Sequence, residues 1–98
     1  MSRQRVIKRA AEIETNKAVI WYETQRPGLG RDFLAEFRRT LDIVSSRPES
    51  FPQHYRTARR ALLRRFPYAI YFAVYVNQIT VIAVLHTSQS QHRLRGRI

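Results

Sequence analysis

Arginines in the second half of the chain are the residues whose type and spacing best suit chemistry. They form a dense cluster and a C-terminal series at every second position: Arg59, Arg60, Arg64, Arg65, Arg93, Arg95 and Arg97. Guanidinium groups bind phosphate or carboxylate through two hydrogen bonds and can hold charge in a phosphoryl-transfer transition state. In a regular strand the first and last of the four clustered arginines would lie on one face and the middle two on the other. Without a bulge, the four would therefore not form one patch.

His86 is the candidate general base. It follows an apolar strand pattern, where side chains emerge at the rim of a sheet, and an unperturbed imidazole has a pKa of about 6.5. The alternative is that His86 caps the strand through a hydrogen bond and positions the residues after it. The other two histidines, His54 and His92, lie in polar segments and are expected to be solvated.

Nothing in the sequence suggests a metal or a cofactor. There is no cysteine, and the three histidines are not at ligand spacing. Gly28 and Gly30 belong to a turn between helices rather than to a phosphate-binding loop. Residues 51–98 hold no carboxylate, which argues against chemistry by paired acids. We expect no cofactor and no metal, and a binding protein rather than an enzyme.

Charge is distributed unevenly along the chain. Residues 1–50 hold ten Lys/Arg and seven Asp/Glu, a net charge of +3, whereas residues 51–98 hold eight Arg and no acid, a net charge of +8. The guanidinium groups of the second half are therefore expected to face water, carbonyl groups or an external anion. The alternative is that the positive charge serves only to keep the protein soluble. The stronger prediction is an acidic macromolecular partner, with the seven arginines as contacts to the target or the antagonist.

Length and composition indicate one globular domain over residues 1–98. The absence of cysteine suits a reducing cytosol. The longest apolar run, Ala69 to Val76, is far shorter than the ~20 residues of a membrane span. No signal peptide is recognisable at the N-terminus. We expect a cytoplasmic protein without a membrane partner.

The first half of the chain predicts a short strand and two helices. Residues 5–8 form the strand, and a helix starts at about Ala10 and ends before Pro27 and Gly28. One face of this helix carries Ala10, Ile13, Lys17, Ile20 and Trp21, with Trp21 expected as a core anchor. The second helix, over residues 31–45, has a clean apolar stripe of Phe33, Phe37, Leu41 and Val44. The short connection predicts an antiparallel helical hairpin.

The second half predicts strands. Residues 48–58 are expected to form a loop, followed by strands over residues 60–65, 68–76 and 79–85. Tyr68, Tyr71 and Tyr75 are expected to be half-buried sheet residues, with base stacking as the alternative. The predicted fold class is α+β: a short N-terminal strand, an antiparallel helical hairpin, then an antiparallel three-stranded meander packed on the helices.

With this order of elements, four segments carry a resemblance to a known family: Trp21–Glu23, Pro27–Phe33, Arg64–Tyr68 and Val84–His86. Over roughly residues 5–97 the chain resembles the RelE/ParE superfamily, the toxins of bacterial type II toxin–antitoxin pairs, and the ParE branch matches best. The resemblance implies a toxin that is held inactive in a hetero-oligomer with an acidic antitoxin, and a role of the pair in plasmid stabilisation.

The two branches of the superfamily imply different targets. ParE-type toxins inhibit DNA gyrase without a catalytic residue of their own, whereas RelE-type toxins cut mRNA on the ribosome with basic residues and sometimes a C-terminal Tyr or His. Many relatives have a basic residue just after the strand-terminal histidine, where this chain has Thr87, Ser88 and Gln89, and a tryptophan near the C-terminus, where it has Leu94. The first departure favours gyrase inhibition over RNA cleavage, for which His86, Arg64 and Arg65 would be the catalytic residues. A non-toxic nucleic-acid-binding module is the third hypothesis.

Overall fold

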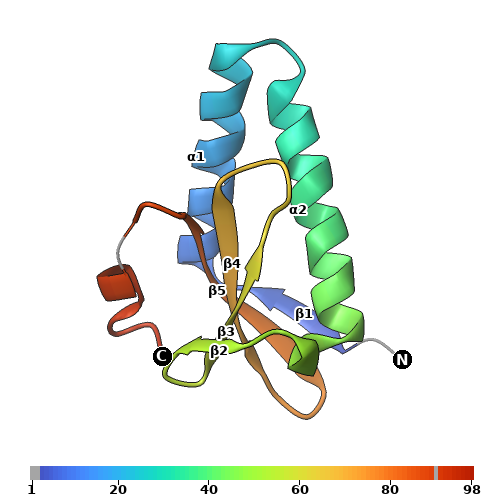
Figure 1. Ribbon diagram of the computed structural model, residues 1–98, viewed down its shortest axis with the longest axis vertical. Coiled ribbons are helices and arrows are strands. Elements are labelled where there is room, and N and C mark those ends of the chain that lie inside the picture. The colour runs from blue at the N-terminus through green and yellow to red at the C-terminus, as the bar shows by residue number, and fades with distance from the viewer. Residues whose placement is uncertain (1–2, 90) are drawn as a thin grey trace.

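The helices and strands follow the predicted order. The computed structural model describes residues 3–89 and 91–98. Its elements are β1 (Gln4–Ile7), α1 (Arg9–Gln25), α2 (Leu29–Ser46), a 3₁₀ turn (Pro48–Ser50), β2 (Gln53–Tyr55), β3 (Ala58–Leu62), β4 (Tyr68–Val74), β5 (Gln78–His86) and a second 3₁₀ turn (Gln91–Leu94) (Figure 1). The α+β fold, with a helical hairpin between the first strand and the meander, is confirmed. We call residues 87–98 the tail.

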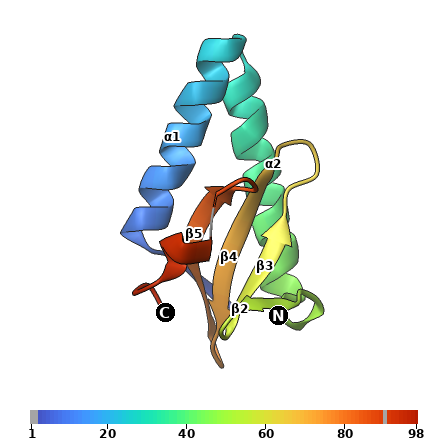
Figure 2. The same ribbon diagram turned by 60° about the vertical axis from the view of Figure 1, so that its left-hand side comes forward.

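The strands form one mixed sheet in the order β1-β5-β4-β3-β2. Strand β1 runs parallel to β5, and the helical hairpin provides the crossover that a parallel pair requires. The short strand β2 lies within the segment predicted as a loop and adds a fourth strand to the meander. Both helices lie on one side of the sheet and the second 3₁₀ turn lies on the other (Figure 2).

The predicted stripe of α2 forms the centre of the core. Phe33, Phe37, Leu41 and Val44 are all buried and pack with Phe72 and other apolar residues of the sheet. An amphipathic helix such as α2 is stable when its apolar face packs against the rest of the fold. The opposite face of the sheet has a smaller cluster, in which Leu94 of the tail is fully buried.

The predicted buried face of α1 is wrong. The helix buries Ala11, Thr15, Ala18 and Tyr22, whereas Trp21 is 54% exposed. The small side chains let α1 approach the sheet and α2 closely, and the ring of Tyr22 stacks on Phe33 at 5.4 Å. The stripe that contains Trp21 therefore faces away from the core.

A tight turn holds the two helices together. The Glu23 carboxylate accepts hydrogen bonds from the backbone N–H groups of Gly28 and Gly30, each at 3.0 Å, and these bonds, that from Gly28 foremost, hold the pKa of Glu23 below its ordinary value. Gly28 has a left-handed backbone, with φ of 90°. A Cβ at Gly30 would lie 2.6 Å from the carbonyl oxygen of Val19, so only glycine allows this close helix packing.

Strand β3 ends earlier than predicted, and the residues after Leu62 form the connection to β4. The strand predicted over residues 60–65 ends at Leu62, because the N–H of Arg64 donates to the Glu36 carboxylate at 2.7 Å instead of to a neighbouring strand. Glu36 is buried, and its second carboxylate oxygen accepts a hydrogen bond from Arg39 at 2.6 Å. Burial alone would raise the pKa of Glu36, but the bonds from Arg39 and Arg64 outweigh it and set the pKa below its ordinary value.

Ser45 gives a first testable prediction, because its hydroxyl is buried without a hydrogen-bond partner among the described residues. A desolvated hydroxyl without a partner costs free energy. The Ser45→Ala variant should therefore be more stable by about 1 kcal/mol in chemical denaturation. A matched change at exposed Ser46, whose hydroxyl donates to the carbonyl of Asp42, should give no gain. A loss of stability in Ser45→Ala would contradict the burial of an unpaired hydroxyl.

Candidate functional site

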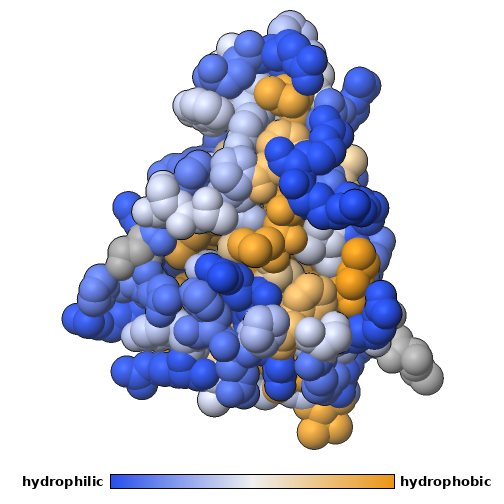
Figure 3. Space-filling view, viewed as in Figure 1, coloured by the Kyte–Doolittle hydropathy of each residue, from blue (hydrophilic) through white to orange (hydrophobic). Residues whose placement is uncertain are grey.

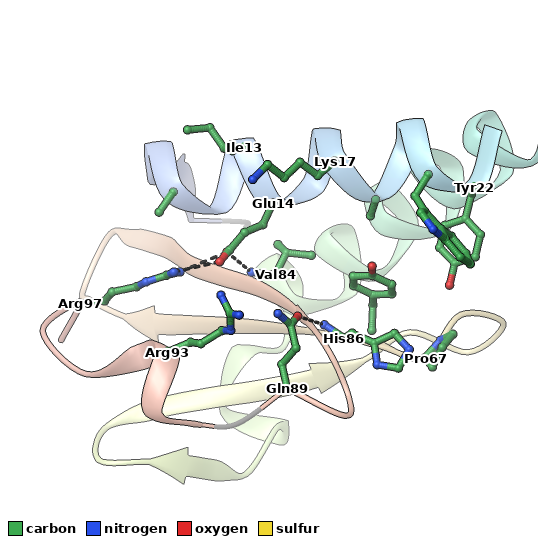
Figure 4. Close-up of a pocket in the computed structure, with 14 residues that line it drawn as sticks. Ile13, Glu14, Lys17, Tyr22, Pro67, Val84, His86, Gln89, Arg93 and Arg97 are labelled. Carbon is green, nitrogen blue, oxygen red and sulfur yellow. Dashed lines mark hydrogen bonds and ion pairs between the residues drawn. The ribbon is translucent and has the colours of Figure 1, made fainter. Parts of the chain in front are cut away.

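A groove of about 820 Å³ lies between α1 and the tail, above the end of β5 (Figure 4). Its α1 wall includes Ile13, Lys17 and Trp21, from the stripe that the sequence predicted as core. Ile13 is 41% exposed and Trp21 is 54% exposed, so these two large apolar side chains of α1 are accessible at the groove. The tail contributes Arg93 on the opposite side. The groove thus combines apolar surface with cations from both walls.

Side chains hydrogen-bond to the edge of β5 beyond the point where β1 ends. Glu14 of α1 accepts a hydrogen bond from the Val84 N–H at 3.0 Å, and Arg97 of the tail donates to the Ile82 carbonyl at 3.2 Å. Glu14 and Arg97 also bind each other through two hydrogen bonds, of 3.1 and 2.9 Å (Figure 4). These contacts join α1, β5 and the tail into one frame around the groove.

The expectation that arginines of the second half face water, carbonyls or an external anion is wrong for Arg97. Its guanidinium forms an ion pair with Glu14, and both side chains are mostly buried. The second half has no carboxylate of its own, but the fold brings one from α1. Both Arg93 and Arg97 line the groove, but Arg97 acts as an anchor of the tail through its pairing with Glu14 (Figure 4).

His86 lines the groove at the end of β5 and makes the hydrogen bonds of a strand cap. Its ring Nδ1 accepts a hydrogen bond from the Ser88 backbone N–H at 3.0 Å, and its backbone N–H donates to the Gln89 side-chain oxygen at 2.8 Å. Its ring packs against that of Tyr68 in a T-shaped arrangement. A backbone N–H can only donate, so Nδ1 is the nitrogen without a proton. The neutral ring therefore carries its hydrogen on Nε2 and is a donor at that atom.

The four clustered arginines are dispersed by the fold. Arg59 lies on the helix side of the sheet and donates to the Phe51 carbonyl at 2.6 Å. Arg60 lies on the opposite side, as strand alternation predicts, and lines a second pocket. Arg64 and Arg65 lie in the β3–β4 connection, where alternation no longer applies. Their side chains do not converge on His86, because neither contributes to the groove.

Arg65 makes weak contacts within the chain. It lies over the ring of Phe66 at 5.5 Å, and its guanidinium is 3.9 Å from the Asp32 carboxylate. Arg64 is held through its backbone, and its side chain is exposed. Both remain candidate contacts for a partner, on a part of the surface separate from the groove.

The tail is coiled rather than extended, so its alternating arginines do not share one surface. The 3₁₀ turn and the buried Leu94 place Arg93 in the groove and Arg95 in the second pocket. His54 and His92 also line that pocket. His54 is half-buried and hydrogen-bonded to Gln91, so the expectation that it is solvated is wrong.

The three tyrosines have different environments. Tyr68 is half-buried beside the groove, and burial raises its pKa. Tyr71 is buried, and Tyr75 is 56% exposed because β4 ends one residue before it. The half-buried environment expected for all three is therefore observed at Tyr68 alone.

In residues 3–89 and 91–98 no group of three or more His, Cys, Asp or Glu is placed to hold a metal ion. No helix in this part of the chain has the length and apolar character to cross a membrane.

Comparison with known proteins places the chain by its fold. No family model matches the sequence, and no curated protein matches it. Among solved structures, the chain is similar to one described as "Chromosomal ParDE TA system from P. aeruginosa", with a TM-score of 0.77 and 13% sequence identity. The match covers 87% of this chain and 96% of that chain. This protein therefore has the fold that its resemblance to the RelE/ParE superfamily implied.

Proposed function

We propose that this protein is the toxin of a bacterial type II toxin–antitoxin pair, that it inhibits DNA gyrase, and that an acidic antitoxin neutralises it. The observation that carries the proposal is the groove between α1 and the tail, with apolar side chains exposed on a helix of a strongly basic chain. The shared fold with a chain of a ParDE structure supports the assignment to a toxin–antitoxin pair.

The chemistry of the groove supports an amphipathic, acidic segment as its occupant. Ile13 and Trp21 offer exposed apolar surface. Tryptophan is among the residues that contribute most to binding energy at protein interfaces. Lys17 and Arg93 stand on opposite walls, and neither has a carboxylate within ion-pair distance in the described part of the chain. An antitoxin segment with apolar residues on one side and carboxylates flanking them would complement both features.

The hydrogen bonds of His86 support gyrase inhibition over RNA cleavage. A general base needs an unprotonated nitrogen that faces the substrate, and the nitrogen without a proton here already accepts the Ser88 N–H. The groove residue Glu14 is engaged by Arg97 and by the Val84 N–H, so it is not available as a base either. A toxin that acts by binding requires neither.

Trp21 should be the main contact to the antitoxin. We expect Trp21→Ala to weaken binding of the antitoxin by at least about 30-fold, because tryptophans buried at interfaces contribute ~2 kcal/mol or more. Ile20→Ala is the matched control, since Ile20 is 65% exposed on the same helix and does not line the groove. Calorimetric titration measures both. Equal losses in the two variants would place the antitoxin elsewhere.

The target is tested with the purified protein in two assays, gyrase-dependent DNA breakage and mRNA cleavage on translating ribosomes. We expect breakage without cleavage. Ribosome-dependent cleavage that falls by about 10²–10⁴-fold in His86→Ala would instead assign the chain to the RNA-cutting branch. A folded protein that is silent in both assays, and whose expression without an antitoxin does not slow growth, would contradict the toxin assignment.

A further inference from the structure

The groove between α1 and the tail contains a carboxylate, which is unfavourable for an acidic occupant. Glu14 is the only aspartate or glutamate among the described residues that line the groove, and it lies between the cations Lys17 and Arg93. By Coulomb's law alone, a carboxylate in this position repels an acidic partner. The contacts of Glu14 within the chain indicate instead that it determines the shape of the groove.

Both carboxylate oxygens of Glu14 are engaged. Oε1 accepts hydrogen bonds from the Val84 N–H at 3.0 Å and from Arg97 at 3.1 Å, and Oε2 accepts a second one from Arg97 at 2.9 Å (Figure 4). The exposed fractions of the Glu14 and Arg97 side chains are 18% and 25%, so water and salt screen this two-bond ion pair less than an exposed one. Glu14 thus ties the tail to α1, the opposite wall of the groove.

Apolar burial holds the tail at one residue. Hydrophilic side chains gather at the corner of the molecule where the tail lies (Figure 3). Of the two apolar residues of the tail, Leu94 is fully buried on the sheet face opposite the helices, whereas Ile98 is 40% exposed. One buried side chain fixes a single point of a segment and leaves its orientation to polar contacts. The ion pair of Arg97 with Glu14 is the contact that orients the tail relative to α1.

The position of Arg93 depends on this orientation. Arg93 is exposed, directly precedes Leu94, and lines the groove from the tail (Figure 4). We propose that Glu14 is a positioning residue of the antitoxin site: through Arg97 it holds the tail so that Arg93 forms the cationic wall opposite Lys17. This inference rests on the proposed function. It has the consequence that a carboxylate of the toxin increases the affinity for an acidic partner.

The groove contains its own reporter, because Trp21 is the single tryptophan of the chain and lines the groove. The probe is a synthetic amphipathic helix of leucine, alanine and glutamate, about 18 residues long, titrated against the toxin with Trp21 fluorescence as the readout. Glu14→Gln removes the charge and keeps an acceptor for the Val84 N–H. We expect it to weaken binding of the peptide by about tenfold, although it removes a negative charge from the groove.

Glu12→Gln is the matched control, since it removes the same charge from an exposed position of α1 outside the groove. It should leave the affinity unchanged within about twofold or raise it slightly. A double-mutant cycle then separates positioning from a general loss of structure. In an Arg93→Gln background, Glu14→Gln should cause no further loss, because the cation that it positions is absent. Additive losses in variants that melt like the parent would overturn the proposal.

Spin labels follow the tail directly, without any partner. The chain has no cysteine, so labels at Asn16→Cys on α1 and Arg95→Cys in the tail report the distance between the two walls of the groove. We expect a narrow distance distribution in the labelled parent and a broad one once Glu14→Gln is added. A distribution that this change leaves narrow would overturn the positioning role.

The outcomes separate this inference from the proposed function. If the parent does not bind the peptide, the groove is not a site for an acidic amphipathic segment, and the proposed antitoxin site and this inference are both overturned. If the parent binds the peptide and Glu14→Gln binds it equally well or more tightly, the positioning role alone is overturned.

Discussion

Replacing Glu36 by alanine is expected to lower the free energy of unfolding by about 3 kcal/mol, a large share of the stability of a domain this size. Glu36 is 4% exposed, and its carboxylate accepts hydrogen bonds from the Arg64 N–H and from Arg39. The variant would leave the Arg64 N–H without its partner and release the β3–β4 connection from α2. Chemical denaturation measures the loss. Glu12→Ala, which removes an exposed carboxylate of α1, is the control and should change stability by about 0.5 kcal/mol or less.

The contribution of Glu36 should also depend on pH. Its folded-state pKa lies below the ordinary value of 4.5, so the carboxylate stabilises the fold fully at pH values above 4.5. This contribution is lost as the pH falls below 4.5 and through the lower folded-state pKa. Between neutral pH and pH values below that range, the parent should therefore lose more stability than Glu36→Ala. Parallel pH profiles for the two proteins would contradict the role of the buried carboxylate.

Tyr22→Ala should destabilise the protein by about 3–5 kcal/mol, whereas Trp21→Ala, one residue earlier, should cost about 1 kcal/mol or less. Tyr22 is 9% exposed and contacts the rings of Phe33, Phe66 and Tyr68. Its loss would open a cavity between the helices and the sheet. Trp21 contacts Tyr22 edge to face, but more than half of its surface is in solvent.

Thermal or chemical unfolding of the two alanine variants checks this prediction. Tyr22→Phe serves as a control that keeps the ring, and it should retain most of the stability of the parent. If Trp21→Ala proved the more damaging change, the assignment of the α1 faces would be reversed. In the antitoxin titration the order is reversed: Trp21→Ala should weaken binding through the loss of exposed contact surface, which Tyr22 does not offer.

The elements of this fold could be predicted because their local signals agree. The stripe of α2 places four large apolar residues on one side, and the turn at Gly28 has the left-handed backbone that glycine adopts most readily. The buried face of α1 was predicted wrongly because hydrophobicity alone does not distinguish a side chain that packs in the core from one that is exposed on the surface. Its core side is made of small residues such as Ala11 and Ala18, and close packing selects size as much as hydrophobicity.

The candidate site was harder to predict, because its geometry depends on where elements end. Strand alternation predicts that Arg60 and Arg64 share one face of the sheet. The strand ends at Leu62, however, because the Arg64 N–H donates to the Glu36 carboxylate. The ion pair between Glu14 and Arg97 joins residues from opposite ends of the chain, and no local pattern signals it. The two pockets divide Arg93 and Arg95 because the tail folds into a 3₁₀ turn over Gln91–Leu94 instead of continuing as a strand.

The pairing of the first strand with the last has a consequence for biosynthesis. Gln4 pairs with Gln78, so β1 leaves the ribosome long before its partner exists. Contacts between distant segments form late, because closing a long loop costs entropy before any contact rewards it. Strand β5 also supplies buried residues to both faces of the sheet, including Val81 and Leu85. A translation product that stops before β5 would therefore lack the partner of both β1 and β4, and could not form the sheet or the groove.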